Sequence, residues 1–192
     1  MPLYRQASDA AAGDVKLEAI TQPLYDNVNV ASGAGMAVYF QNPGARSPLF
    51  TNVESAGSLT WPKRFNVKAF RLIPSPSGNA EAVVSLHVNG HFTFRVGEKP
   101  YFVCPNFLLT PGVGFEVYQL LGAAVPAAPA NSINLAHNGR ADHHNLYVVQ
   151  HPIWLPSVQN FRVTLDMAAT HVPGVAISTW VMLEGEYFRE IQ

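Results

Sequence analysis

The chain has 192 residues, a formal net charge of −1, and only 13% of its residues are Asp, Glu, Lys or Arg, about half the usual share of roughly 25%. The near-neutral charge and the lack of a basic stripe argue against direct nucleic-acid binding, and the single cysteine, Cys104, excludes an internal disulfide and any zinc site built on paired cysteines. No apolar run reaches the roughly 18 residues of a membrane span, so a membrane does not explain the shortage of charge. The shortage indicates that much of the surface faces other protein.

The first 30 residues predict an N-terminal arm outside the core. Residues 8–20 (SDAAAGDVKLEAI) are the only helical candidate of the chain, in which Ser8 could cap the first turn and Gly13 weakens the helix. An extended conformation fits the segment equally well. We expect no secretory signal here, because the segment lacks a basic end followed by an apolar core.

Strand patterns dominate the rest of the chain, because 15 prolines and 14 glycines divide it into short segments. Residues 161–167 (FRVTLDM) and residues 92–97 (FTFRVG) alternate between apolar and polar positions, and residues 83–90 (VVSLHVNG) predict a further strand. The side chains expected to face inward are Phe161, Val163, Leu165, Met167, Phe92, Phe94, Val96, Val84, Leu86 and Val88.

The stretch from residue 51 to 74 (TNVESAGSLTWPKRFNVKAFRLIP) fits either a glycine loop that opens a helix or a turn followed by a strand. Its apolar residues recur with period two from Phe65 onward, and prolines border them on both sides. We therefore predict a turn and a strand. Phe70 and Leu72 break the alternation, which predicts a β-bulge near Ala69.

The predicted strands are eight: residues 35–41, 65–73, 83–90, 92–97, 99–105, 145–155, 161–167 and 175–188. Eight short strands with turns between them are typical of a two-sheet jelly roll. We predict an all-β chain, with an eight-stranded antiparallel jelly-roll barrel or sandwich as a single domain over residues 31–192, preceded by the arm at 1–30. Residues 122–144 lack apolar periodicity and predict one long loop, which in a compact domain usually has a function.

No motif predicts catalysis or a cofactor. The glycine pairs in SGAGMAV (32–38) and PGVGFEV (111–117) lack the third glycine and the helix of a dinucleotide-binding fingerprint, so turn glycines are expected there. A G-x-S-x-G nucleophile elbow is missing as well. We therefore predict no catalytic residue and no cofactor.

The histidines raise the question of a metal, because converging imidazoles in a β-barrel hold metal in cupin-type oxygenases. His87 and His91 flank an Asn89-Gly90 turn four residues apart, and the pattern of a His-x-His pair with a following glutamate is absent. We predict no metal site, with a cupin-like metal enzyme as an open alternative. The other histidines near the long loop and its exit are His137, His143, His144 and His151.

The last predicted strand, residues 175–188 (VAISTWVMLEGEYF), indicates an interface. One face carries Val175, Ile177, Val181 and Leu183, and the opposite face carries Trp180 and Met182. A strand that is apolar on both faces is usually buried on both sides, so either a neighbouring subunit or the N-terminal arm is expected to cover the second face. With the long loop, the interface candidates are Trp180, Met182, Arg140, His143 and His144.

Four segments carry a resemblance to a known family: LFTNVESAGSL (49–59), FNVKAFRL (65–72), FRVGEKPYFVCP (94–105) and HPIWLPSVQNFRVTLDM (151–167). The shared elements are a "TN…AGSL" turn before an "F.VK" strand, a "GEK.Y" turn and a "PI.L…QNF.V.L" strand pair. Over about residues 35–188 the chain resembles the jelly-roll capsid proteins of tailless icosahedral bacteriophages.

This resemblance implies a virion structural protein without catalytic residues. Subunits of that family assemble into capsomers that tile a shell, often over an internal membrane, so the implied partners are copies of the chain and other capsid proteins. Two alternatives from other classes stay open: the cupin-like metal enzyme, and a carbohydrate-binding jelly roll in which Trp61, Trp154 or Trp180 stacks on a sugar.

Overall fold

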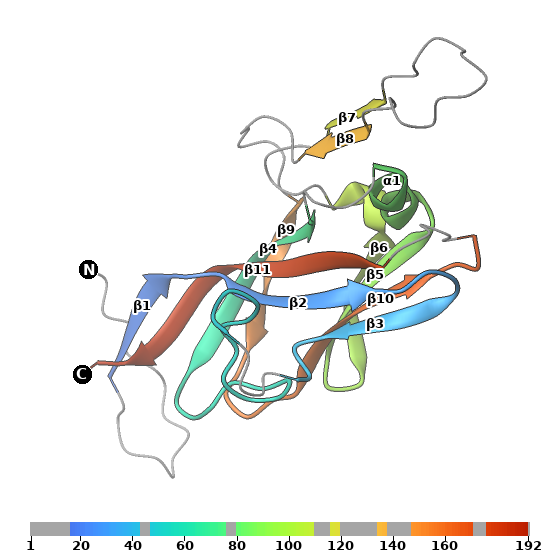
Figure 1. Cartoon of the computed structure of the whole chain (residues 1–192). Coiled ribbons are helices and arrows are strands. Elements are labelled where there is room, and N and C mark those ends of the chain that lie inside the picture. Colours follow the sequence, from blue (N-terminus) through green and yellow to red (C-terminus); the bar gives the residue numbers. More distant parts are fainter. Residues whose placement is uncertain are drawn as a thin grey trace, which may run out of the picture.

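The computed structural model describes residues 16–42, 47–75, 80–109, 116–119, 134–137, 147–170 and 176–191. These residues form an all-β chain with one short α-helix, in which two antiparallel sheets curl around a shared core (Figure 1). The predicted all-β class is therefore confirmed. The arrangement is that of a curled half-barrel, compatible with a β-sandwich.

One sheet has five strands and is built around the long strand β11 (Ile177–Glu190). One edge of β11 pairs with β4 (Arg64–Pro74), which in turn pairs with β9 (Tyr147–Leu155). The other edge of β11 pairs with two strands in succession, β2 (Leu24–Val30) and β1 (Leu17–Thr21). All these pairings are antiparallel.

The second sheet has four strands in the order β3 (Gly35–Tyr39), β10 (Phe161–Met167), β5 (Gly90–Val96) and β6 (Lys99–Pro105). Seven of the eight predicted strands are present: β3, β4, β5, β6, β9, β10 and β11. The inward faces predicted for β5 and β10 are confirmed, since the large apolar side chains of both strands are buried and only Val96 is partly exposed.

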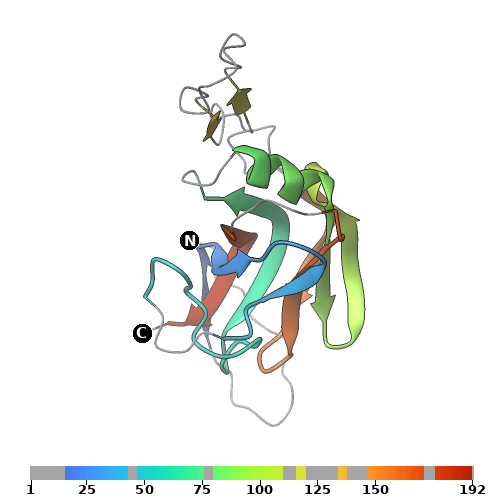
Figure 2. The ribbon, with the colours of Figure 1, turned by 45° about the vertical axis from the view of Figure 1, so that its right-hand side comes forward.

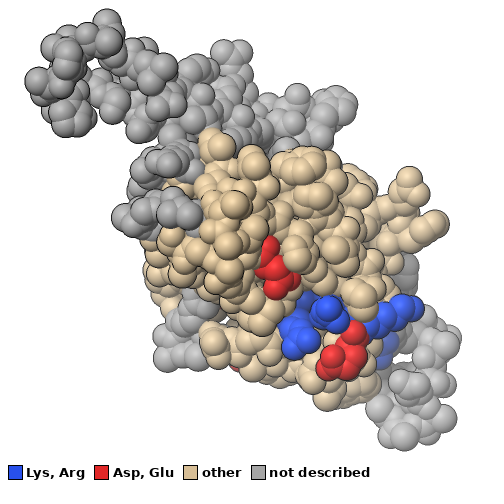
Figure 3. Space-filling view, turned by 90° about the vertical axis from the view of Figure 1, so that its right-hand side faces the viewer, with Lys and Arg blue, Asp and Glu red and all other residues tan. Residues whose placement is uncertain are grey.

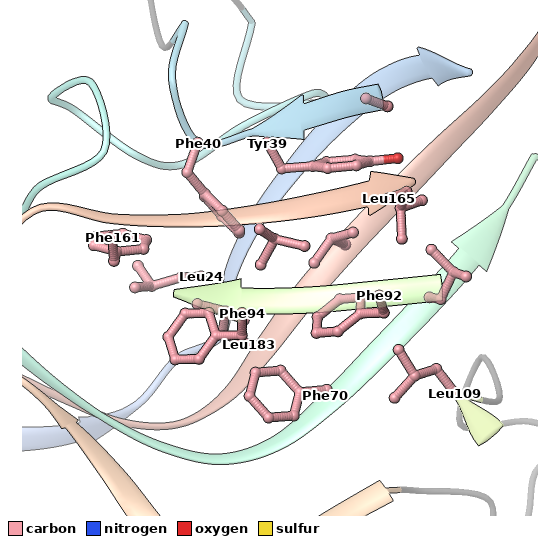
Figure 4. Packing of buried hydrophobic residues seen from close by; sticks show 14 of the residues in the cluster. Leu24, Tyr39, Phe40, Phe70, Phe92, Phe94, Leu109, Phe161, Leu165 and Leu183 are labelled. Atoms are coloured by element: carbon pink, nitrogen blue, oxygen red, sulfur yellow. The ribbon is translucent and has the colours of Figure 1, made fainter. Parts of the chain in front are cut away.

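The core lies between the two sheets and is dominated by aromatic rings (Figure 4). Phe70 of β4 lies with its ring centroid 5.4 Å from that of Phe92, 5.2 Å from that of Phe94 and 4.9 Å from that of Phe102. Phe92 and Phe94 belong to β5 and Phe102 to β6, so one side chain of the first sheet contacts two strands of the second. These contacts hold the two sheets face to face.

The predicted bulge in β4 is confirmed. The register between β4 and β9 shifts between Val67 and Ala69, and Ala69 and Phe70 are both buried although they are neighbours in the strand. Gly185 of β11 lies opposite, and a Cβ atom built on it would be 1.8 Å from the carbonyl oxygen of Asn66. The bulge thus brings two backbones so close that only glycine fits.

The strand predicted at residues 83–90 is wrong, because this segment is the helix α1 (Ala80–Val88). Ala82, Val83 and Leu86 are buried, a spacing that places them on one face of a helix, whereas Val84 and Val88 are exposed on another. The Val/Leu alternation at 84, 86 and 88 imitated a strand. Packing of the helical face against the end of the sheets overrides the strand propensity of valine.

Residues 1–30 also differ from the predicted arm over the part that is described. Residues 17–30 form β1 and β2 of the five-stranded sheet, and Leu24 and Val30 belong to the core. The helical candidate at 8–20 is likewise extended from Leu17 onward, and residues 1–15 lie outside the described residues. Deleting residues 1–30 would remove two strands from the five-stranded sheet.

Helix α1 lies at one end of the two sheets, next to the 3-10 turn η1 (Asn106–Leu108) (Figures 1 and 2). The short strands β7 (Glu116–Gln119) and β8 (Asn134–His137) pair with each other beyond this helix. Strand β8 falls within the long loop predicted at 122–144, and the rest of that loop lies outside the described residues.

Candidate functional site

The outer face of β11, expected to meet a neighbouring subunit or the arm, is partly covered by a loop of the same chain. The indole nitrogen of Trp180 donates a hydrogen bond to the carbonyl oxygen of Leu49 at 3.3 Å, and the hydroxyl of Tyr25 donates one to the carbonyl of Pro48. Tyr25 lies beside Met182 in the β2–β11 pair. Trp180 and Met182 are half-buried in consequence.

The loop segment that lies over Trp180 exposes apolar side chains to solvent. Leu49 is 69% exposed and Phe50 is 38% exposed, while farther along the same face two ion pairs join Arg71 to Glu184 and Lys68 to Glu186. Arg71 lies directly opposite Met182 in the β4–β11 pair, so the uncharged part of this face is limited to the surroundings of Trp180 and the loop over it. The interface candidates Arg140, His143 and His144 lie outside the described residues.

A second apolar region runs along the edge strand β6, through η1, to the helix α1. No Asp, Glu, Lys or Arg occurs in residues 82–94 or 100–109, and Asn106 of η1 is tied to α1 by a 2.9 Å hydrogen bond from its side-chain nitrogen to the carbonyl oxygen of Leu86. We name this region the β6–α1 surface. Its exposed side chains are Tyr101, Val103, Phe107, Leu108, Val84 and Val88.

Among the described residues, the charged groups visible on this side of the molecule lie in its middle and lower part (Figure 3). They are engaged within the chain: an imidazole nitrogen of His91 lies 3.3 Å from a carboxylate oxygen of Asp166, and Arg95 donates to the carbonyl oxygen of Glu98 at 3.2 Å. Arg162 lies near the Glu98 carboxylate, 3.9 Å away. At the start of β6, the ammonium of Lys99 lies 5.1 Å from the ring centroid of Tyr101, so charge borders the β6–α1 surface there as well.

The histidines of the described residues do not converge on one point. His87 is buried at the end of α1, where its Nδ1 atom lies 3.4 Å from the carbonyl oxygen of Asn106. Burial lowers its pKa, and the contact with Asn106 offsets part of that shift. Among the described side chains no group of three or more His, Cys, Asp and Glu is close enough to hold a metal. His137, His143 and His144 have no described side chain, so the absence of a metal stays a prediction.

Cys104 lies on the inner side of β6 and is buried. Burial raises the pKa of its thiol to about 12, so almost no thiolate forms near neutral pH. A nucleophilic cysteine needs the opposite environment, partly exposed and electropositive. This thiol is therefore a small apolar group of the core rather than a catalytic one.

No protein-family model matches the chain, and no curated protein matches it significantly. In the part of the chain with described structure, no helix is long and apolar enough to cross a membrane. The functional argument accordingly rests on the surfaces themselves.

The β6–α1 surface was missed in the sequence because residues 83–90 were assigned to a strand. The available signal was the lack of charge in residues 82–94 and 100–109, two stretches that are separated in sequence only by a short charged turn. Helical spacing in the first stretch would have placed Val84 and Val88 four residues apart on an exposed face.

Proposed function

We propose that the chain is a jelly-roll capsid subunit that assembles with copies of itself, and with other capsid proteins, into the shell of a tailless icosahedral virus. The proposal combines the sequence resemblance with two features of the structure. One is the order in which the strands pair, and the other is the exposed β6–α1 surface.

The strand order supports the jelly-roll part of the proposal. A jelly roll is a long antiparallel hairpin wrapped around itself, so that among eight strands the first pairs with the last, the second with the seventh, the third with the sixth and the fourth with the fifth. Counted from β2 without β7 and β8, the corresponding pairs are β2–β11, β3–β10, β4–β9 and β5–β6, and all four are formed. In this description β1 is an additional strand before the first one.

The observation that carries self-assembly is the group of exposed apolar side chains on the β6–α1 surface. Val88 is 68% exposed, and Val103 and Phe107 are each 58% exposed, on elements that adjoin one another. Large apolar groups that gather on a surface mark protein–protein contacts more often than isolated exposed residues do. A second copy is the occupant we favour, because β6 is an edge strand of its sheet in the described residues and can meet another edge.

The remaining parts of the proposal follow from the same assignment. A shell protein of near-neutral charge would contact its neighbours in the virion rather than the genome, and the resemblance also implies an internal membrane beneath some shells of this kind. We assign the chain no catalytic residue and no cofactor in this role.

The test is the assembly state of the purified chain, measured by light scattering and electron microscopy at high concentration. We expect oligomers or particles for the natural chain, and smaller species when Val103→Asp and Phe107→Asp are combined, because two buried charges would oppose association. Val158→Asp is the matched control, since Val158 is 69% exposed in the turn before β10, far from α1 in the fold.

Circular dichroism and thermal melting of each variant separate loss of assembly from loss of folding. A natural chain that remains monomeric and is absent from viral particles would disprove the proposal. A double variant that assembles normally would move the contact away from the β6–α1 surface.

A further inference from the structure

A groove opens at the end of the five-stranded sheet opposite α1. Its volume is about 810 Å³, within the roughly 300–1,000 Å³ of small-molecule sites. One wall is the turn with Trp61, Pro62 and Lys63, and the other is the end of β11 with Tyr187 and Arg189. The capsid proposal assigns no role to this groove.

An exposed aromatic ring forms part of the first wall. The side chain of Trp61 is 49% exposed, and the guanidinium carbon of Arg64 lies 5.8 Å from its ring centroid. A cation over an indole is an attractive contact that helps to hold the ring in position. The ring thus offers a broad apolar surface on a short turn that leads directly into β4.

The opposite wall supplies a hydroxyl on a rigid element. The ring of Tyr187 packs at 6.3 Å from that of Phe65, which is fully buried. Burial, together with the negative charge of Glu54, raises the pKa of Tyr187 to about 12, while Arg189 opposes the shift. The phenol is therefore neutral at physiological pH and can both donate and accept hydrogen bonds.

The charges of the groove balance, and three of its four charged side chains form ion pairs inside the chain. Its lining includes Glu54 and Glu190 against Lys63 and Arg189. Lys63 forms an ion pair with Glu54, which also accepts a hydrogen bond from the Thr60 hydroxyl at 3.4 Å. The Nε atom of Arg189 lies 2.6 Å from a carboxylate oxygen of Glu18. A charged ligand would compete with these pairs, whereas a neutral polyhydroxyl ligand could hydrogen-bond to their outer atoms.

We propose that this groove binds a neutral saccharide, with a sugar ring stacked on the free face of Trp61 and its hydroxyls hydrogen-bonded to Tyr187 and to the Lys63–Glu54 pair. A sugar ring has an apolar face and a rim of hydroxyls, which matches an indole beside balanced donors and acceptors. A peptide strand would instead need an unpaired sheet edge or a series of apolar pockets. This inference does not depend on the capsid proposal.

The experiment is a glycan array, followed by calorimetric titration with cellotriose, maltotriose and triacetylchitotriose. We expect saturable binding of at least one neutral glycan. Trp61→Ala should weaken it by at least about tenfold, the factor that corresponds to about 1.4 kcal/mol. Trp154→Ala is the matched control, because Trp154 is a similarly exposed indole, 42%, on β9 and outside the groove lining.

A second variant keeps the inference testable if Trp61→Ala does not fold. Tyr187→Phe retains the ring and removes only the hydroxyl, and it should weaken the same glycan several-fold with an unchanged melting temperature. Absence of any neutral glycan among the binders would overturn the proposal. So would glycan binding that neither variant alters, or a Trp61→Ala effect confined to self-association, which would make the groove a protein contact.

Discussion

The two ends of strand β4 lead to surfaces of opposite character. Near Arg64 the chain forms the groove, where Lys63 is paired with Glu54 and Arg189 with Glu18. At the other end of β4, Pro74 leads toward α1 and the β6–α1 surface, which has apolar side chains and no ion pair among the described residues.

This difference leads us to expect two kinds of recognition at the two ends of the molecule. A groove with satisfied charges is hydrated at little cost and needs no protein partner. An apolar surface gains free energy only when something removes it from water. We therefore expect changes at the groove end to alter small-ligand binding, and changes at the α1 end to alter assembly.

The substitution with the largest expected effect is Phe70→Ala, because Phe70 lies between the two ends of β4 and contacts three aromatic rings of the second sheet. We expect the free energy of unfolding to fall by about 3–5 kcal/mol, with both surfaces affected. Urea unfolding followed by circular dichroism measures it. Phe107→Ala is the control, since this exposed ring should change stability by no more than about 0.5 kcal/mol. Equal losses for both variants would contradict the placement of the core.

A change in the core, outside both surfaces, is Asp26→Ala. The buried carboxylate of Asp26 accepts a 2.6 Å hydrogen bond from the backbone N–H of Phe40, which has a left-handed backbone with φ of 67°. Losing this charged acceptor should cost about 2–3 kcal/mol. Asp166→Ala, which removes a half-exposed carboxylate beside His91, should cost less than about 1 kcal/mol. Both losses of stability can be measured from urea midpoints. An Asp26→Ala variant as stable as the natural chain would contradict a stabilising role for this hydrogen bond.

At the α1 end, His87 makes stability depend on pH. Its pKa is lower in the folded chain than the ordinary value near 6.5, so the unfolded chain takes up the proton at higher pH. The contribution of His87 is complete above about pH 6.5 and is lost as the pH falls toward the folded pKa. We expect a lower urea midpoint at pH 5.5 than at pH 7.5.

The variant His87→Gln should reduce this difference between the two pH values, whereas His91→Gln, at an exposed imidazole, should preserve most of it. The quantity compared between variants is the difference between the urea midpoints at the two pH values. A substitution that lowers stability equally at both pH values does not change this difference. An identical pH dependence in the natural chain and in His87→Gln would show that another group is responsible.

The smallest expected effect is an increase in the free energy of unfolding, on substitution of Val158. Val158 has a φ of 63°, a left-handed conformation that is unfavourable for a β-branched side chain. Val158→Gly or Val158→Asn should raise the free energy of unfolding by up to about 1 kcal/mol, because both residues tolerate this backbone. Differential scanning calorimetry would detect the higher melting temperature. Val148→Gly, in strand β9, should have the opposite sign.

Local periodicity predicted much of the fold correctly. The alternation in residues 161–167 and 92–97 identified two central strands and their buried faces, and the broken alternation after Ala69 identified the bulge. These features depend on the backbone geometry of a single segment with one buried face, so they can be read from neighbouring residues.

Contacts between distant segments could not be read in this way. The sequence showed that β11 is apolar on both faces, but only the tertiary structure placed residues 47–50 over Trp180, about 130 positions away, and β1 and β2 along its edge. The same holds for the groove, which joins Leu24, Trp61 and Tyr187. In residues 83–90 the valines fit a strand as well as a helix, and packing at the end of the sheets decided between them, because burial of Ala82, Val83 and Leu86 outweighs a small local preference.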